Sequence, residues 1–433
     1  MMTRTNGNRF RKGNSKSIAN RQPGGKSLPA QSKVTTEKAV PRKVQTFEDI
    51  QKQFSAWAQD MHIPGKIQAW WTCESHPENS DWKIYNKLVN GHESLMLDSP
   101  IKGMDVPAVV QRVMEQVRKE HLRNFRKSIR TIWFRACGNG QFALVVQANL
   151  RGKNSAHENK TFVDFLERSC PEIVSCHQIQ CVPFVPFDPT IHQSTRIESR
   201  CNFGSDLMPL GDTGLSMHVL DWAPRIKDGW LQFPQKIAAA IHFVRGDKFF
   251  EFYSGASFVA LSLAPLFGQV ESQDCRETAM ISSRQNIRNL GQDNARFHRG
   301  FFEPGFLNKF FSKSENDGRW TFYFNLPAVE PLPTGTVDAI AGARPERILL
   351  QMSDLEMATK LIRQFRNQGY VLRKTIPLYL EPGSGKFEIL TLFVPDRAGL
   401  LGRSPLKKPQ KVIKNASKTL FVQKTPTFRQ RKD

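Results

Sequence analysis

The C-terminal half of the chain alternates short apolar strands with amphipathic helices, and this alternation constrains the fold more than any other feature. Strand-like segments at 249–253 and 269–274 are each followed by a helical pattern, at 258–266 and 277–289. Repeated β–α units pack as parallel strands with helices on both faces, so the pattern predicts a doubly wound α/β sheet. Such sheets bind their ligands at the carboxyl ends of the strands.

The same alternation continues almost to residue 395. Further strands are expected at 320–325 and 348–352, followed by a helix at 355–368. Two strand patterns at 370–380 and 387–394 then follow each other with no helix between them. A short connection of this kind joins antiparallel strands, so the sheet is predicted to end in an antiparallel pair.

Residues 46–224 indicate a separate α+β module. Strand patterns at 131–137 and 141–150 flank a Gly-Asn-Gly sequence at 138–140, which is a strong hairpin signal. Apolar residues recur at helical spacing through 106–127 and predict a helix whose opposite face is basic. That face is either an RNA contact or an ordinary solvated surface. Its basic residues are Arg112, Lys119, Arg123 and Arg126.

Most of the net charge of +22 lies at the two ends of the chain. Residues 1–36 hold eight basic residues and no acidic one, and 403–433 hold ten basic residues against one acid. The composition predicts two disordered basic arms, at 1–45 and 398–433, that wrap RNA. The other interpretation is that they are targeting or solubilising extensions. The tail lysines expected to contact RNA are Lys407, Lys408 and Lys411.

The cysteines and the hydropathy exclude several classes of protein. Seven scattered cysteines without a secretory signal indicate reduced thiols in an intracellular compartment. No apolar run is long enough to span a bilayer, so no membrane partner is expected. The acid-free N-terminus suggests a mitochondrial address, with a nuclear or nucleolar one as the alternative. Cys170, Cys176, His177 and Cys181 match no common zinc spacing, so they are predicted to be structural and no metal site is expected.

Two segments of the doubly wound region carry recognisable motifs. Residues 250–255 read Phe-Glu-Phe-Tyr-Ser-Gly, where the RNA uracil-5 methyltransferases of tRNA and ribosomal RNA have Glu-Leu-Tyr-Cys-Gly. Residues 347–354 read Arg-Ile-Leu-Leu-Gln-Met-Ser-Asp and resemble that family's Arg-Ile-Leu-Tyr-x-Ser-Cys-Asn-Pro. The resemblance implies a Rossmann-like, class I S-adenosylmethionine-dependent methyltransferase domain at 225–397, with the terminal antiparallel hairpin. The α+β module before it would then bind RNA.

The resemblance also implies S-adenosylmethionine as the cofactor. Asp274 follows the second strand, where the family has the acid that binds the cofactor ribose. Ser257 matches the second glycine of the first motif and would place a side chain where the cofactor approaches. The positions that match cofactor-binding residues of the family are Gln232, Tyr253, Gly255 and Asp274.

The catalytic positions depart from the family. The family's reaction uses a cysteine thiolate that adds to the uracil ring and a glutamate that later removes a proton. Ser353 stands at the cysteine position, and a hydroxyl is a much weaker nucleophile than a thiolate. Asn325 replaces the aspartate of the family's Asp-Pro-Pro-Arg, and only Glu388, at the proton-removing position, is kept. The substitutions imply a catalytically degenerate member.

Three functions follow as hypotheses. The first is a non-catalytic protein that binds structured RNA, with ribosomal RNA preferred to transfer RNA, and that acts in ribosome or mitoribosome assembly beside ribosomal or assembly-factor proteins. The alternative is an active S-adenosylmethionine-dependent RNA methyltransferase that uses a non-covalent mechanism. The third is a scaffold whose methyltransferase-like domain docks another protein.

Overall fold

The computed structural model describes most of the chain between the two predicted arms. The arms, with Lys407, Lys408 and Lys411, lie outside the described residues. None of the helices within the described part is both long and apolar enough to cross a membrane. The described residues are 46–89, 92–150, 152–180, 187–188, 199–313, 319–326 and 332–397.

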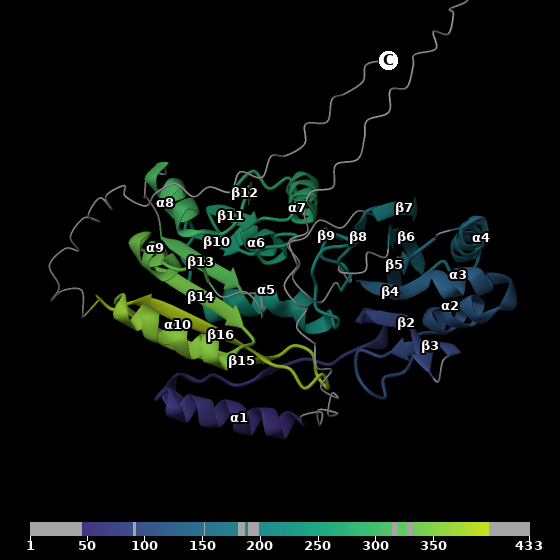
Figure 1. Cartoon of the computed structure of the whole chain (residues 1–433). Coiled ribbons are helices and arrows are strands. Elements are labelled where there is room, and N and C mark those ends of the chain that lie inside the picture. Colours follow the sequence, from purple (N-terminus) through teal and green to yellow (C-terminus); the bar gives the residue numbers. More distant parts are fainter. Residues whose placement is uncertain are drawn as a thin grey trace, which may run out of the picture. The chain divides into compact units, whose positions relative to one another are not determined.

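The C-terminal half forms an eight-stranded sheet in the order β1-β15-β16-β14-β13-β10-β11-β12 (Figure 1). The five strands from β10 to β14 are parallel, and β16 is antiparallel to both β14 and β15. The predicted doubly wound sheet and its terminal antiparallel pair are therefore confirmed. The strands are β1 (Trp71–Thr72), β10 (Lys248–Phe252), β11 (Gln269–Asp274), β12 (Ala295–Arg299), β13 (Trp320–Asn325), β14 (Arg347–Met352), β15 (Tyr370–Tyr379) and β16 (Glu388–Pro395).

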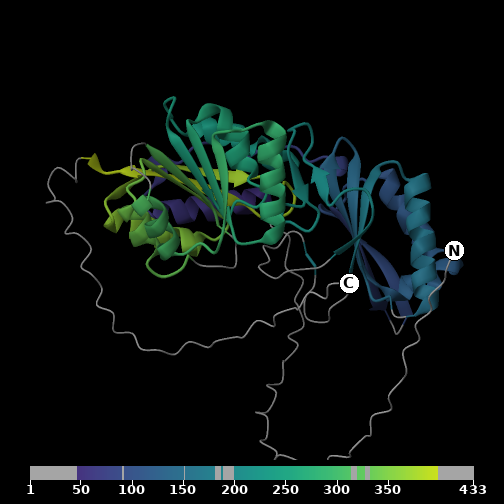
Figure 2. The same ribbon diagram turned by 90° about the horizontal axis from the view of Figure 1, so that it is seen from above.

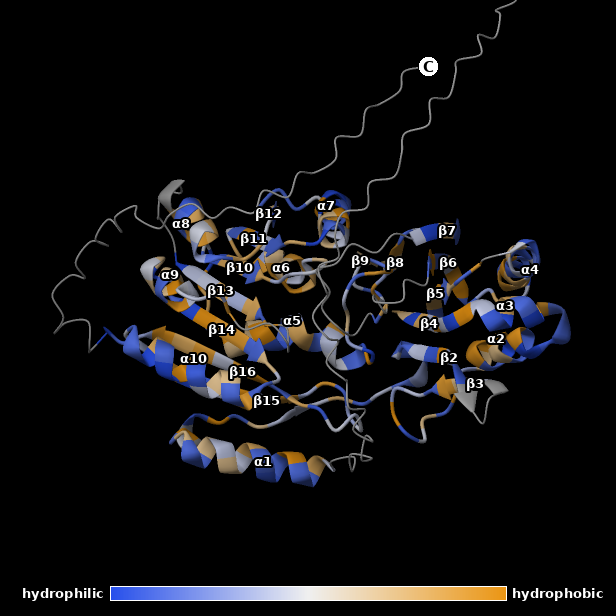
Figure 3. Ribbon diagram, in the orientation of Figure 1, coloured by the Kyte–Doolittle hydropathy of each residue, from blue (hydrophilic) through white to orange (hydrophobic). Residues whose placement is uncertain are grey.

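Helices cover both faces of this sheet because successive strand residues point to opposite sides. Figure 2 shows helices on both sides of the sheet. Phe249 belongs to the core that includes residues of α5, α6 and α7, and Phe250 to the core that includes residues of α1, α8, α9 and α10. Figure 3 shows the apolar character of the central strand β14 and the hydrophilic outer side of α10. The helices are α1 (Phe47–Asp60), α5 (Asp228–Ala240), α6 (Phe258–Leu263), α7 (Glu277–Leu290), α8 (Pro304–Lys313), α9 (Thr336–Gly342) and α10 (Leu355–Asn367).

The segment at the start of the described chain belongs with this sheet and not with the module to which the sequence assigned it. Ile50 and Phe54 of α1 are buried in the core that contains Phe250, and the Trp57 Nε1 donates to Thr359 Oγ1 at 2.9 Å. Strand β1 pairs with β15. The helical periodicity of α1 shows that one face is buried, but it does not say against which sheet.

The module itself is a six-stranded sheet in the order β3-β2-β4-β5-β6-β7. The predicted hairpin is confirmed: β4 and β5 pair, and Asn139 and Gly140 have positive φ angles of 54° and 70°. Three helices cover one face, and the small β8–β9 hairpin packs on the other. The elements are β2 (Trp82–Val89), β3 (His92–Asp98), α2 (Ala108–Arg118), α3 (Arg123–Ser128), β4 (Ile129–Gly138), β5 (Gln141–Ala148), α4 (Lys153–Ser169), β6 (Ile173–Gln180), β7 (Ser199–Phe203), β8 (Leu207–Pro209) and β9 (Ser216–His218).

Candidate functional site

The turn after β10 is where the fold predicts a ligand site, and its backbone is unusual. Tyr253, Gly255 and Ser257 all have positive φ angles, of 56°, 55° and 57°. Only glycine adopts this region without strain, so the turn is held by the structure around it. The Ser257 hydroxyl is buried and lies 2.7 Å from the Oγ atoms of both Ser272 and Ser283. The expectation that Ser257 obstructs the cofactor is therefore wrong, because its side chain points into the protein.

Both oxygens of the Asp274 carboxylate accept hydrogen bonds from neighbouring protein groups. The Gly255 N–H donates to Oδ2 at 2.9 Å, and Arg276 donates from its backbone N to Oδ1 at 2.9 Å. The Arg276 side chain donates from Nε to Oδ1 at 3.0 Å and from Nη2 to Oδ2 at 2.9 Å. Both oxygens of the predicted ribose-binding acid are thus engaged, and only 1% of Asp274 is exposed.

A second buried carboxylate, that of Asp221, forms an ion pair with the Arg276 guanidinium. Asp221 Oδ1 lies 2.5 Å from Arg276 Nη1, and Asp221 has no exposed surface. Burial raises the pKa of Asp221, and the positive charge of Arg276 opposes that shift. Burial alone would disfavour the charged guanidinium, but the two carboxylates outweigh it and raise the pKa of Arg276. One buried cation is therefore shared between two acids.

This arrangement does not fit S-adenosylmethionine bound through Asp274. A ribose at that position needs a free acceptor site on the carboxylate, but each oxygen already accepts two hydrogen bonds, three of the four from Arg276 and one from Gly255. A Cβ atom placed on Gly255 would lie 3.3 Å from Arg276 Nη2, so the guanidinium stands directly beside the glycine of the turn. Arg276 was not among the residues predicted for the site, although it lies only two residues after Asp274. No motif or residue spacing in the sequence marked Asp221 as part of the site.

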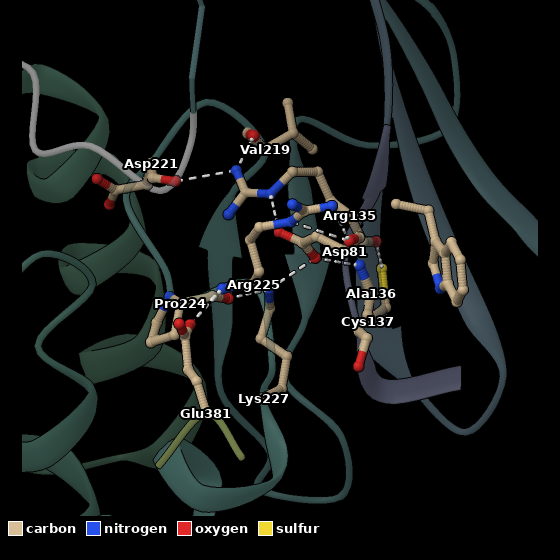
Figure 4. A network of polar contacts seen from close by, with 12 residues as sticks. Asp81, Arg135, Ala136, Cys137, Val219, Asp221, Pro224, Arg225, Lys227 and Glu381 are labelled. Carbon is tan, nitrogen blue, oxygen red and sulfur yellow. Dashed lines mark hydrogen bonds and ion pairs between the residues drawn. The ribbon is translucent and has the colours of Figure 1, made fainter. Parts of the chain in front are cut away.

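The same network continues into the α+β module, as Figure 4 shows. Arg135 of β4 donates from Nη1 to the backbone oxygens of Asp221 and Val219, at 2.9 and 2.5 Å. Its Nε donates at 3.2 Å to Asp81, which also accepts from Lys227 Nζ at 2.6 Å. Burial lowers the pKa of Lys227 to about 8, although Asp81 opposes the shift. Ion pairs and a hydrogen bond to the backbone of Asp221 thus connect the turn beside β10 to the start of β2.

Two of the predicted catalytic residues, Asn325 and Glu388, lie beside Gln351, a residue that the sequence did not mark as part of the site. Gln351 donates from Nε2 to Glu388 Oε2, and accepts at Oε1 from the hydroxyl of Tyr323. Asn325 is the register partner of Gln351 on the neighbouring strand. Burial raises the pKa of Glu388, against the hydrogen bond from Gln351. The fold therefore places Asn325 and Glu388 on the two sides of Gln351.

Ser353 lies just beyond this group, in the bend that follows β14, and its side chain is exposed. The next residue, Asp354, is the N-cap of α10 and accepts from the backbone N–H groups of Glu356 and Met357, at 2.7 and 3.0 Å. The segment therefore starts a helix by ordinary side-chain capping. A hydroxyl at position 353 supplies no thiolate to this edge of the sheet.

The other two predicted cofactor residues differ in their surroundings. Gln232 is exposed on α5, whose buried side consists of residues such as Trp230 and Phe233. The Trp230 ring packs on Phe258, at the start of α6, with 4.4 Å between ring centroids. Tyr253 is part of the turn itself, and its ring meets Phe302 edge-on at 5.6 Å. Of these two, only Tyr253 lies within the turn beside Asp274.

The predicted basic face does not lie on one helix. Helix α2 ends at Arg118, because Lys119 has an extended ψ of 145°, and α3 begins only at Arg123. Arg126 Nη1 donates to the freed carbonyl of Arg118 at 2.6 Å. Arg112 Nη2 lies 2.7 and 2.6 Å from the two carboxylate oxygens of Glu172. The guanidinium groups of Arg112 and Arg126 therefore bind groups within the module, which the helical periodicity alone did not reveal.

Two of the predicted basic residues stay at the surface. Lys119 and Arg123 are exposed, and Arg123 Nη1 lies 3.5 Å from Glu120 Oε1. Within the described part of this face, the residues still available for the predicted RNA contact are therefore Lys119, Arg123 and their exposed neighbours.

Comparison with known proteins supports the fold. No family model and no curated protein sequence matches the chain. The tRNA (uracil-54, C5)-methyltransferase of Pyrococcus abyssi, solved with S-adenosyl-L-homocysteine, is similar in structure with a TM-score of 0.56 and 13% identity, over 79% of this chain and 83% of that one.

Two further solved structures match the chain over a smaller part. They are an rRNA methylase from Streptococcus thermophilus (TM-score 0.30, 16% identity, 38% of this chain and 96% of that one) and a dimethyladenosine transferase from Plasmodium falciparum (0.31, 13%, 39% and 63%). The match to the Pyrococcus abyssi enzyme covers most of both chains. The chain therefore has the fold of the class I S-adenosylmethionine-dependent methyltransferases.

Proposed function

We propose that this chain is a catalytically inactive protein that binds structured RNA on a methyltransferase scaffold. Its expected target is ribosomal RNA during assembly of the ribosome or mitoribosome, in company with ribosomal or assembly-factor proteins. The proposal combines a site that does not fit its cofactor with a strongly basic chain.

The observation that carries the proposal is the Arg276 ion cluster. A methyltransferase needs a cofactor pocket whose acid is free to bind the ribose, yet here Asp274 is bound on both oxygens by Arg276. Arg276 also pairs with the buried carboxylate of Asp221, so its guanidinium is held between two acids of the protein itself. The cluster thus occupies the oxygens with which Asp274 would bind a ribose.

The position of the catalytic nucleophile gives independent support. Ser353 matches the family's cysteine, and its hydroxyl has a far higher pKa than a thiol. The charge of +22 supports RNA as the partner, since basic arms release counterions from a phosphate backbone. The solved neighbour from Pyrococcus abyssi is named as a tRNA methyltransferase, which favours RNA over other polyanions.

The cofactor half of the proposal is tested by isothermal titration of the full-length protein with S-adenosylmethionine. We expect no binding heat at about 1 mM ligand, a concentration at which even weak complexes form. Mass spectrometry of RNA incubated with protein and cofactor should show no new methyl group. Detection of 5-methyluridine, or of any other methylated nucleotide, refutes the proposal and favours the alternative of an active non-covalent methyltransferase.

The RNA half is tested by crosslinking the protein in cells and sequencing the bound RNA. Enrichment of ribosomal RNA precursors supports the proposal, and enrichment of mature transfer RNA alone contradicts the target. Imaging of the full-length protein tests the expected mitochondrial address against a nuclear or nucleolar one.

A further inference from the structure

Three metal-binding side chains meet at the edge of the six-stranded sheet, away from the site described above. His177 of β6 is the register partner of Cys201 of β7, so their side chains leave the sheet on the same face. Asp206 follows in the turn after β7, and its Oδ1 lies 3.4 Å from His177 Nδ1. One ligand atom from each residue lies within 4.8 Å of the other two.

A tight turn builds this cluster. Gly204 has a φ of +81°, and a Cβ atom there would lie 2.6 Å from the Cβ of Ser175 and would also overlap the carbonyl oxygen of Val174. Only glycine lets the chain pass this close to β6. The turn thereby brings the carbonyl of Ser205 to 3.0 Å from His177 Nε2.

The hydrogen bond to Ser205 selects the tautomer of His177. A carbonyl oxygen only accepts, so Nε2 carries the proton, and Nδ1 of the neutral ring then presents its lone pair. Metal-binding histidines have this arrangement, in which the second ring nitrogen donates to a backbone carbonyl.

The Nδ1 atom is the unexplained group. His177 has no exposed surface, and Nδ1 has no hydrogen-bond partner among the residues that the structure describes. Its lone pair instead faces the carboxylate of Asp206, so two acceptors oppose each other at 3.4 Å. A buried acceptor without a partner is costly, and a cation between the two atoms removes the cost.

We propose that His177, Cys201 and Asp206 bind one zinc ion. In a tetrahedral zinc site the nitrogen and oxygen ligands stand about 3.3 Å apart, which matches the separation of Nδ1 and Oδ1. A set of one imidazole, one thiolate and one carboxylate suits Zn²⁺ better than the hard cations, which prefer oxygen ligands alone. The fourth position is open to water, because Cys201 and Asp206 are exposed.

The ion would fasten the edge strand β7 and its turn to β6. From the sequence, His177 was grouped with Cys170, Cys176 and Cys181, and no metal site was expected; Cys181 lies outside the described residues. The structure separates those groups: Cys170 lies beside Arg112, and Cys176 faces the opposite side of β6 from its neighbour His177. The partners Cys201 and Asp206 become visible only through strand pairing. This proposal does not depend on the proposed RNA function.

The test uses the full-length protein, stripped of metal and kept reduced, in a titration with Co²⁺ as a spectroscopic substitute for Zn²⁺. We expect a thiolate-to-cobalt charge-transfer band that saturates at one ion per chain and disappears when Zn²⁺ is added. Cys201→Ser should abolish the band, and Asp206→Asn should weaken metal binding by at least about tenfold. Cys73→Ser and Asp212→Asn are the matched controls and should leave both properties unchanged.

The absence of the band in the reduced protein at a several-fold excess of Co²⁺ overturns the proposal. It is equally overturned if Cys201→Ser keeps the band, or if Asp206→Asn binds as tightly as Asp212→Asn. His177 is fully buried, so its replacement risks unfolding the module. The exposed ligands Cys201 and Asp206 avoid that problem, and circular dichroism of each variant confirms that the fold is kept.

Discussion

The guanidinium of Arg276 forms a bidentate hydrogen bond with the carboxylate of Asp274, with Nε 3.0 Å from Oδ1 and Nη2 2.9 Å from Oδ2. The two residues are separated by one position in the sequence and lie at the end of β11, where a doubly wound sheet presents its ligand site. The guanidinium also pairs with Asp221, which reaches the α+β module through Arg135. An internal cation thus links the ligand edge of one sheet to the other sheet.

Replacing this cation should destabilise the protein strongly. Arg276→Ala leaves the buried carboxylates of Asp221 and Asp274 without their counter-charge, so we expect the free energy of unfolding to fall by about 3–5 kcal/mol. Arg284→Ala, on the exposed side of α7, is the control and should change it by less than about 0.5 kcal/mol. Urea denaturation measures both. Equal losses in the two variants would show that the cluster adds no stability.

The cluster can also be tested as a coupled unit. Because Asp221 and Arg276 are in contact, the loss in the double variant Asp221→Ala with Arg276→Ala should be smaller than the two single losses combined. We expect a coupling of about 1–3 kcal/mol in a double-mutant cycle. Simple additivity would contradict a shared buried ion pair.

Removing the guanidinium should also open the space beside Gly255. We expect Arg276→Ala to give a measurable binding heat at about 1 mM S-adenosylmethionine, where the unaltered protein gives none, because the oxygens of Asp274 lose their main donors. Arg276→Lys keeps a cation there and should show no gain. Isothermal titration compares the three proteins. A gain in the lysine variant as large as in the alanine variant would argue against this explanation.

The stability of the protein should fall with rising pH through the neutral range. Burial raises the pKa of Glu251 to about 8, although the backbone N–H of Ala260 donates to its carboxyl group. The unfolded chain therefore loses this proton near pH 4.5 and the folded one only near pH 8, so ionisation favours unfolding between these values. Glu251→Gln should remove a decline of roughly 3 kcal/mol, measured as unfolding free energy between about pH 5 and 8. The exposed Glu303→Gln should keep the decline.

Two glycines with similar backbone angles should respond differently to alanine. Gly204 and Gly103 have φ angles of +81° and +84°, but only Gly204 has close neighbours. Gly103→Ala should cost about 1 kcal/mol of stability, from its backbone conformation alone. Gly204→Ala should cost at least about 3 kcal/mol, since its methyl group also overlaps β6. Thermal denaturation compares the two variants. Equal losses of stability would show that β6 shifts to accommodate the methyl group at position 204 with little loss of free energy.

RNA binding should distinguish exposed from paired basic residues. Arg123→Ala and the triple variant Lys407→Ala, Lys408→Ala and Lys411→Ala should weaken RNA binding and lower its salt dependence, by about one phosphate contact per residue. Arg112→Ala should hardly change RNA affinity, because its guanidinium is held by Glu172. Filter binding at several salt concentrations measures this. An equal loss in Arg112→Ala would mean that the pair opens when RNA binds.

The sequence by itself determined the local elements and their type. The strands at 269–274 and 320–325 occur where the alternation of strand and helix patterns predicted them, and both are buried along nearly their whole length, as expected of parallel strands covered on two faces. The hairpin at 138–140 followed from the backbone freedom of its glycines. The resemblance of the motif at 250–255 also led to the correct fold and to Asp274.

Only the tertiary structure decided which distant groups meet. Periodicity says that α1 buries a face, but not that its partner is the sheet containing β15, and it does not bring Asp221 to Arg276 or Cys201 to His177. These contacts join positions tens of residues apart, and they depend on how complete sheets pack rather than on any local preference. Charges and ligand atoms act over a few ångströms of space, so their chemistry is set by that packing and not by their spacing along the chain.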